Sequence, residues 1–335
     1  MDRDMPKVTM PSRSAAPAGA ALQPSGEGLK LPADYDAIFA DRVTIITGVG
    51  RSGTTILGKI VGSFASTYYL YEPVTLRLLS ALMNQPRLSS TLASAMKAIL
   101  FEDFFLQQLQ GRNINPNPAD DSFTGNYSTK RDVAARWRRR RRSEVIEFLW
   151  ANPARFVMKI PEFQPLMTVA RETFPGARFL HIIRNGNDVI SSALVRGWYS
   201  DASLSQEFAE WMHAGDGSQV GVPWFVTGED RKQFPRWNAA TRTACVWRTL
   251  TEAGRAFCRA NPRESMEFRY EDFAKDPASF VKRIEVFLAA TSTAITRKHV
   301  RGVTQHRGAG YADLRETIDQ PERAKYQRLL TALGY

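Results

Sequence analysis

The chain has 335 residues, of which 43% are hydrophobic and 24% charged, so it is long and apolar enough to bury a sizeable core. These values exclude collagen-like, fully disordered and small disulfide-rich proteins, and no stretch reaches the roughly 18 apolar residues of a membrane-spanning helix. The net charge of +11 is local, because residues 130–142 hold eight bases and one acid. We therefore expect local contacts with an anionic ligand and no specific nucleic-acid surface.

The first 36 residues are rich in proline, alanine, glycine and serine, a composition that predicts a disordered N-terminal tail for 1–36. Proline and glycine also interrupt every apolar run near the start, so we expect no signal peptide and a cytoplasmic location.

Cys245 and Cys258 fall in one predicted helix, about 20 Å apart and beyond disulfide reach, which indicates reduced thiols.

From Arg42 onward, short β-branched or apolar runs alternate with longer helical stretches. This pattern predicts that residues 37–335 form a single domain of the α/β class, with three α/β/α layers and a central, mostly parallel five-stranded sheet. The predicted strands are Val43–Thr47, Tyr68–Tyr71, Phe156–Ile160, Arg178–Ile183 and Met266–Tyr270. The predicted helices are Thr54–Ala65, Thr75–Gln110 with a break near Pro86, Asp132–Trp150, Pro165–Phe174, Asp188–Arg196, Asn238–Asn261, Ala278–Ala289 and Glu322–Leu333.

A glycine-rich loop, Gly48-Val49-Gly50-Arg51-Ser52-Gly53-Thr54-Thr55, follows the first predicted strand and precedes an apolar helix. Free backbone N–H groups and the positive end of the helix dipole converge at such a turn, which predicts a P-loop-like anion site. The Walker A pattern fits this loop except that Thr54 stands where the lysine belongs, and the cation is Arg51. Nucleoside triphosphate hydrolysis uses that lysine and magnesium, so the loop suits a less charged group.

A sulfuryl group carries less negative charge than a phosphoryl group, and arginine, lysine and backbone donors can support its transfer. The segment 51–55 resembles the 5′-phosphosulfate loop of sulfotransferases that use 3′-phosphoadenosine 5′-phosphosulfate (PAPS), particularly the carbohydrate and tyrosylprotein branches. The resemblance implies PAPS as co-substrate, no metal requirement, and cofactor contacts by Arg51, Ser52, Gly53, Thr54 and Thr55. The alternative is an ordinary glycine turn.

The second predicted strand ends in Tyr68-Tyr69-Leu70-Tyr71-Glu72-Pro73, which resembles a segment of carbohydrate sulfotransferases in which a glutamate is the expected base. Aryl and steroid sulfotransferases instead carry a histidine two residues after a strand lysine, a position that Pro161 occupies here. The resemblance therefore implies that Glu72 is the catalytic base, with Glu162 as the second candidate. The alternative for Glu72 is to stabilise the N-terminus of the next helix.

Sulfuryl transfer also requires a cation beside the oxygen that is left on the 5′-phosphate. Lys159 ends its predicted strand at the same sheet edge as the glycine loop, and it resembles the lysine found at this point in the superfamily. We therefore assign the cationic role to Lys159 together with Arg51. The alternative for Lys159 is a solvated side chain at a strand end.

Arg184 follows a strand and Ser192 lies eight residues later, in the next predicted helix. Sulfotransferases bind the 3′-phosphate of PAPS with an arginine and a serine at this spacing, so the resemblance assigns both residues to that phosphate. The strand that ends in Tyr270 also resembles the superfamily, which implies that Tyr270 contacts the adenine side. Arg307 is similar, more weakly, to a basic loop over the 3′-phosphate.

Two other segments allow both a functional and a structural interpretation. Residues 198–237 carry four of the seven tryptophans and form either a substrate lid or a loop anchored on the core. Arg138–Arg142 fall in one predicted helix, where five consecutive side chains would encircle the axis and Arg141 would lie on the apolar stripe. These arginines are either solvated, or in contact with an anionic acceptor or an anionic membrane surface.

Asp276 and Pro277 are predicted as the N-cap and first residue of a structural helix.

Together the other features predict a cytoplasmic sulfotransferase that moves a sulfuryl group from PAPS to a hydroxyl. The favoured acceptor is a carbohydrate or glycolipid, and the second choice is a phenol or natural product. A kinase-like phosphotransferase is the rival enzyme. A non-enzymatic nucleotide- or nucleic-acid-binding protein is the rival from another class.

Overall fold

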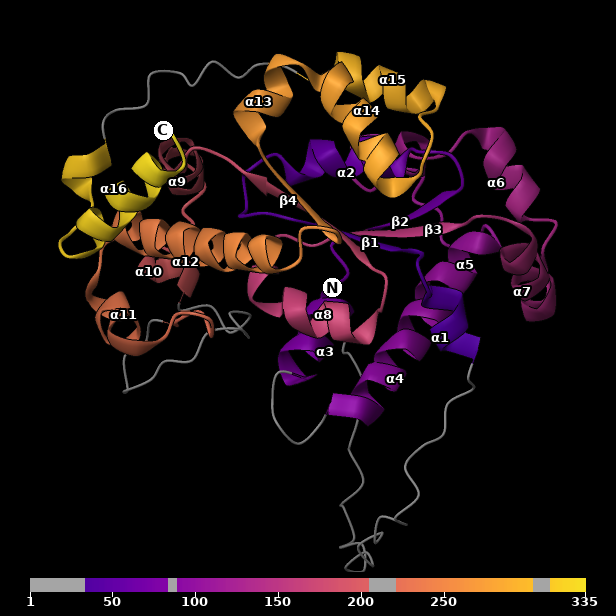
Figure 1. The fold of residues 1–335 in the computed structure, drawn as a ribbon, viewed down its shortest axis with the longest axis horizontal. Helices are drawn as coiled ribbons and strands as arrows, with labels where there is room; N and C mark the ends of the chain where they lie inside the picture. The colour runs from indigo at the N-terminus through magenta and orange to yellow at the C-terminus, as the bar shows by residue number, and fades with distance from the viewer. Residues whose placement is uncertain (1–33, 84–88, 205–220, 304–313) are drawn as a thin grey trace, which may run out of the picture. The chain divides into compact units, whose positions relative to one another are not determined.

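The structure is a computed structural model that describes residues 34–83, 89–204, 221–303 and 314–335. In these residues five strands form one sheet in the order β2-β3-β1-β4-β5, and all four pairings are parallel (Figure 1). The strands are β1 (Val43–Thr47), β2 (Thr67–Tyr71), β3 (Arg155–Lys159), β4 (Arg178–Ile183) and β5 (Ser265–Arg269). The predicted fold class is confirmed, and each predicted strand is present with its boundaries within one residue.

Helices cover both faces of the sheet, which makes three layers (Figure 1). Phe156 and Met158 of β3 pack into the core beneath α1, α4, α8 and α12, whereas Val157 packs into the core beneath α2, α13 and α14. This alternation of buried side chains is what a parallel strand covered on both faces requires. The helices are α1 (Asp34–Phe39), α2 (Thr54–Gly62), α3 (Val74–Met83), α4 (Ser89–Ile99), α5 (Leu106–Leu109), α6 (Lys130–Arg136), α7 (Arg142–Ala151), α8 (Met167–Thr173), α9 (Gly186–Leu194), α10 (Asp201–Leu204), α11 (Gly228–Gln233), α12 (Ala239–Ala260), α13 (Tyr270–Lys275), α14 (Pro277–Leu288), α15 (Ala294–Arg301) and α16 (Glu322–Ala332).

Local capping explains why several predicted helices begin where they do. The Asn238 side chain accepts a hydrogen bond of 2.8 Å from the backbone N–H of Thr241 and starts α12. Asp276 caps α14 in the same way through the N–H of Ser279 at 3.1 Å, and Pro277 is its first residue, as predicted. Both cysteines lie buried in α12 as free thiols, also as predicted.

The predicted helix Asp132–Trp150 is wrong, because the chain breaks between α6 and α7. The break coincides with a cap at the N-terminus of α7. The Glu144 carboxylate accepts hydrogen bonds from the backbone N–H groups of Arg140 and Arg141, at 2.7 and 2.9 Å. Arg141 is consequently extended and exposed. The arginines therefore do not encircle one helix, and Arg141 does not lie on an apolar stripe.

Other differences concern boundaries. The predicted helix Thr75–Gln110 consists of α3, α4, a π-helical segment at Leu100–Phe105 and α5. Helices α1, α10, α11, α13 and α15 were not predicted. Most of the predicted tail, residues 1–33, lies outside the described residues, and α1 begins at Asp34. Within the described chain, no helix has the length and apolar character needed to cross a bilayer.

Candidate active site

The glycine-rich loop joins β1 to α2 at the carboxyl edge of the sheet, where ligands bind in open α/β sheets. Gly53 has a φ of +90°, and a Cβ atom there would lie 2.4 Å from the ring of Tyr270, so only glycine fits. The Ser52 hydroxyl is buried and has no hydrogen-bond partner among the described residues. A buried donor without a partner, beside a helix N-terminus, fits an anionic ligand.

The structure brings Arg184 and Ser192 against Arg51 of this loop. Arg51 Nε donates to Ser192 Oγ at 2.9 Å, and Arg184 Nη1 donates to the backbone oxygen of Arg51 at 3.1 Å. Arg184 also pairs with Asp188 at 3.1 Å, and its guanidinium lies 4.9 Å from the ring centre of Tyr270. The two arginines thus lie within the span of one nucleotide, while Arg307 lies outside the described residues.

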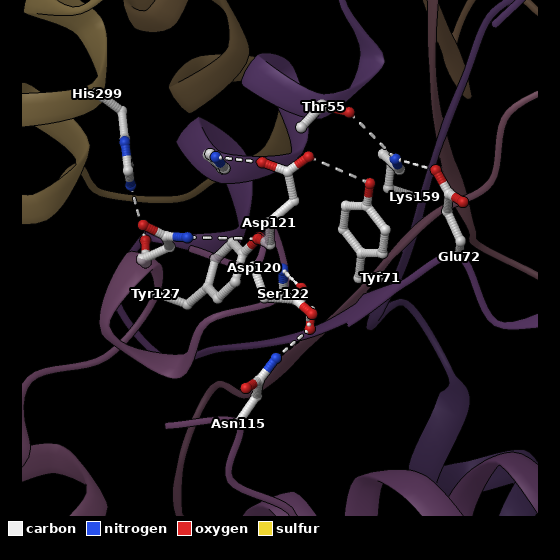
Figure 2. Close-up of polar contacts among 12 residues, drawn as sticks. Thr55, Tyr71, Glu72, Asn115, Asp120, Asp121, Ser122, Tyr127, Lys159 and His299 are labelled. Atoms are coloured by element: carbon white, nitrogen blue, oxygen red, sulfur yellow. Dashed lines mark hydrogen bonds and ion pairs between the residues drawn. The ribbon is translucent and has the colours of Figure 1, made fainter. Parts of the chain in front are cut away.

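Lys159 lies on the other side of the loop, between Ile46 of β1 and Tyr71 of β2 in the register of the sheet. Its ammonium donates to Thr55 Oγ1 at 3.3 Å, forms an ion pair with the Glu72 carboxylate, and lies 3.8 Å from the ring centre of Tyr71 (Figure 2). Only 1% of the Lys159 side chain is exposed. Burial lowers the pKa of Lys159, and the charge of Glu72 opposes that shift.

A cavity of about 610 Å³ opens over Thr55, Tyr71 and Glu72, the partners of Lys159. Four of its lining residues, Arg51, Glu72, Glu162 and Tyr199, are non-glycine residues in the left-handed region, with φ of +70°, +48°, +60° and +59°. Such conformations cost free energy, and they persist where the surrounding structure holds side chains in a required position. The strain therefore marks this cavity as a functional site.

Glu162 also lines the cavity. Its Oε1 accepts a hydrogen bond from the Tyr199 hydroxyl at 3.2 Å. Burial raises the pKa of Glu162, and the charge of Arg77 and a hydrogen bond from the Gly50 backbone oppose the shift. Glu72 is 44% exposed, so it is the carboxylate more accessible from the cavity.

The lining residues that were not singled out in the sequence include Arg77, Asp121 and Tyr199. Asp121 belongs to the segment between α5 and α6, pairs with Lys59 at 2.6 Å, and lies 3.5 Å from the Tyr71 hydroxyl (Figure 2). No motif marks these positions. Only their placement beside the loop identifies them.

Comparison with known proteins assigns the family. Residues 44–219, more than half of the chain, match the model of the sulfotransferase family. The chain belongs to the sulfotransferase family. This family transfers sulfuryl groups, so the cavity over the glycine loop is the candidate active site of the enzyme. A search of curated proteins found no match.

Several solved sulfotransferase structures are similar to the chain at low sequence identity. The sulfotransferase domain of the Synechococcus PCC 7002 olefin synthase is 15% identical, with a TM-score of 0.48, and the match covers 88% of this chain and 94% of that one. The corresponding domain of the curacin biosynthetic pathway is 16% identical, with a TM-score of 0.47 and coverages of 88% and 98%. Mouse sulfotransferase SULT7A1, complexed with PAP, is 11% identical, with a TM-score of 0.37 and coverages of 89% and 86%.

Proposed function

We propose that this enzyme transfers a sulfuryl group from PAPS to an acceptor hydroxyl. Family membership supports the reaction class. The observation that carries the proposal is the placement of the Lys159–Glu72 ion pair on one side of the glycine loop and of Arg184 and Ser192 on the other, where both contact Arg51 of the loop. A base and a cation thus lie next to a site that can hold both phosphates of one nucleotide.

The donor would bind along the glycine loop. The backbone of residues 51–55 and the unpartnered Ser52 hydroxyl would take the 5′-phosphosulfate. Arg184 and Ser192 would take the 3′-phosphate, because their contacts with Arg51 place them next to the loop and within reach of the same nucleotide. Tyr270 packs against Gly53 and Arg184, so its ring would border the adenosine.

The transfer step follows from this placement. Glu72 would accept the proton of the acceptor hydroxyl. The acceptor oxygen then forms a bond to sulfur while the bond between sulfur and the oxygen of the 5′-phosphate breaks. Negative charge then develops on the 5′-phosphate, where the buried Lys159 ammonium and Arg51 would stabilise it. The products are a sulfate ester, the protonated Glu72 carboxyl and 3′,5′-adenosine diphosphate (PAP).

For the acceptor, we propose a carbohydrate or glycolipid first and a phenol or natural product second. Glu72-Pro73 and the absence of a histidine at Pro161 favour the first. Trp198 lies against Gly50 in the cavity wall, and an aromatic ring face suits a sugar ring. We further propose that residues 37–335 act as one domain in the cytoplasm, with the segment 198–237 as a wall or lid over the acceptor.

Ligand-induced thermal stabilisation distinguishes the candidate functions. We expect PAP to raise the melting temperature and magnesium ATP to leave it unchanged. Stabilisation by magnesium ATP alone would indicate a phosphotransferase, and stabilisation by neither nucleotide would indicate a binding protein of another kind.

Replacing Arg184 by alanine should weaken PAP binding by roughly 10- to 100-fold, because a charge-assisted contact to phosphate is lost. Isothermal titration with PAP measures the effect. Arg328→Ala, at an exposed position of α16, is the control that should bind PAP normally. Equal affinities of the two variants would remove Arg184 from the nucleotide site.

The pH dependence of turnover should report on Lys159. Because burial lowers its pKa, Lys159 should lose its proton, and the enzyme its activity, at a lower pH than an ordinary lysine would. Lys159→Arg keeps the positive charge at high pH, so kcat should begin to fall at a higher pH in this variant, even if its maximal kcat is reduced. An alkaline limb that does not move in this variant would assign it to another group.

A further inference from the structure

The six arginines of residues 136–142, around the break between α6 and α7, form two sets that differ in their contacts. Three of them are anchored to the protein. Arg136 donates to Ser128 Oγ at 2.7 Å, Arg139 donates to a backbone oxygen at the end of α5 at 2.9 Å, and Arg142 pairs with Glu102 at 2.9 Å. These contacts fix the backbone of the linking segment and hold it against the core.

The other three arginines, Arg138, Arg140 and Arg141, are exposed, and their side chains form no salt bridge within the described part of the chain. Glu144, the nearest acid on the chain, is engaged by two backbone N–H groups. Trp137 precedes the set and is 58% exposed, an unusual state for so large an apolar side chain. We call Trp137, Arg138, Arg140 and Arg141 the tryptophan–arginine patch.

The orientation of Trp137 leaves its apolar surface available. Its indole N–H is already donated to the backbone oxygen of Gly111 at 2.9 Å, so the exposed part of the ring is mostly carbon. Tryptophan is enriched at membrane–water interfaces, and arginine is attracted to anionic lipid headgroups. Three guanidinium groups within four residues can contact about three phosphates, fewer than the roughly 6–10 phosphate contacts that give nucleic-acid binding its steep salt dependence.

The patch also lies away from the catalytic cavity. Arg136 of α6 stacks over Tyr68 at the start of β2, and α7 leads directly into β3, so both helices border the amino ends of these strands (Figure 1). The cavity lies at the carboxyl ends, over Glu72 and Glu162. A surface bound at the patch would therefore leave the cavity open.

From these observations we propose that the tryptophan–arginine patch docks the enzyme on an anionic phospholipid bilayer. The guanidinium groups contact the headgroups, and the Trp137 ring enters the interface. This association is peripheral, reversible and dependent on salt, because three cations and one aromatic ring provide it. It does not depend on the identity of the sulfuryl donor or acceptor.

Co-sedimentation of the full chain with vesicles tests the proposal. We expect the wild type to pellet with phosphatidylcholine vesicles that contain phosphatidylserine, and not with phosphatidylcholine alone. The triple variant Arg138→Gln/Arg140→Gln/Arg141→Gln should lose on the order of 100-fold in partition coefficient at low salt. Trp137→Ala should lose several-fold at the same net charge.

The matched control removes three exposed bases elsewhere, with Lys232→Gln, Lys275→Gln and Arg328→Gln on α11, α13 and α16. It should pellet nearly as the wild type does, and all variants should keep the wild-type melting temperature and PAP affinity. Equal loss in both triple variants would reduce the effect to net charge and overturn the proposal. Failure of the wild type to bind phosphatidylserine vesicles, or its displacement from them by nucleic acid at far lower phosphate concentration, would also overturn it.

Discussion

Replacing Glu72 by glutamine should lower turnover by roughly 10²- to 10⁴-fold while PAP binding stays nearly intact. Glutamine keeps the size of the side chain but cannot accept the proton of the acceptor hydroxyl. The carboxylate lies across the loop from the Arg184 and Ser192 contacts, so the nucleotide should still bind. Steady-state kinetics with labelled PAPS and titration with PAP measure the two effects separately.

Glu162→Gln is the matched comparison, since Glu162 lines the same cavity but is held by Tyr199. We expect a smaller loss of turnover from this change. Because Glu72→Gln leaves Lys159 without its ion-pair partner, both variants should be assayed well below their melting temperatures. Near-normal turnover in Glu72→Gln, with a large loss in Glu162→Gln, would transfer the role of base to Glu162.

Replacing Arg248 by alanine should lower the free energy of unfolding by about 3–5 kcal/mol, because it leaves the buried Glu322 carboxylate without its partner. Arg248 of α12 contacts Glu322 through two hydrogen bonds, at 2.7 and 3.0 Å, and Asp230 at 2.6 Å. Glu322 is fully buried at the start of α16, and Asp230 lies on α11. One guanidinium therefore connects three helices, and urea denaturation measures its loss.

The double variant Arg248→Met/Glu322→Gln should regain much of this stability, because a neutral pair of similar volume leaves less buried charge uncompensated. Lys232→Ala removes an exposed ion pair with Glu229 and should change stability by less than about 1 kcal/mol. If Arg248→Ala cost no more than Lys232→Ala, the buried network would be stabilised by other contacts.

The sheet could be predicted from the sequence because each strand is marked locally. Strands such as Val43–Thr47 and Arg178–Ile183 are short apolar runs bounded by polar or glycine residues, and both were predicted to the residue. Helix ends with a side-chain cap, such as Asn238 and Asp276, were also readable. The helix predicted across Arg138–Arg142 failed because the break depends on Glu144 bonding to two backbone N–H groups, which periodicity does not reveal.

Some residues of the candidate site could likewise be predicted from local sequence, and others could not. Arg51 and Arg184 follow strands and Lys159 ends one. Parallel strands bring their carboxyl ends to one edge, so the proximity of these residues could be predicted. Arg77, Asp121 and Tyr199 come from α3 and from segments outside regular structure. Their positions depend on packing between distant parts of the chain, which leaves no local pattern.

By itself, then, the amino-acid order determined the parallel α/β fold class and the anion-binding turn, because each strand, each following helix and the glycine loop is marked by a local sequence pattern. Only the tertiary structure decided that Glu72 pairs with Lys159, that strained residues gather around one cavity, and that three arginines turn outward beside Trp137. Those outcomes depend on long-range packing and on competition for hydrogen-bond partners, which are settled only when the whole chain is folded.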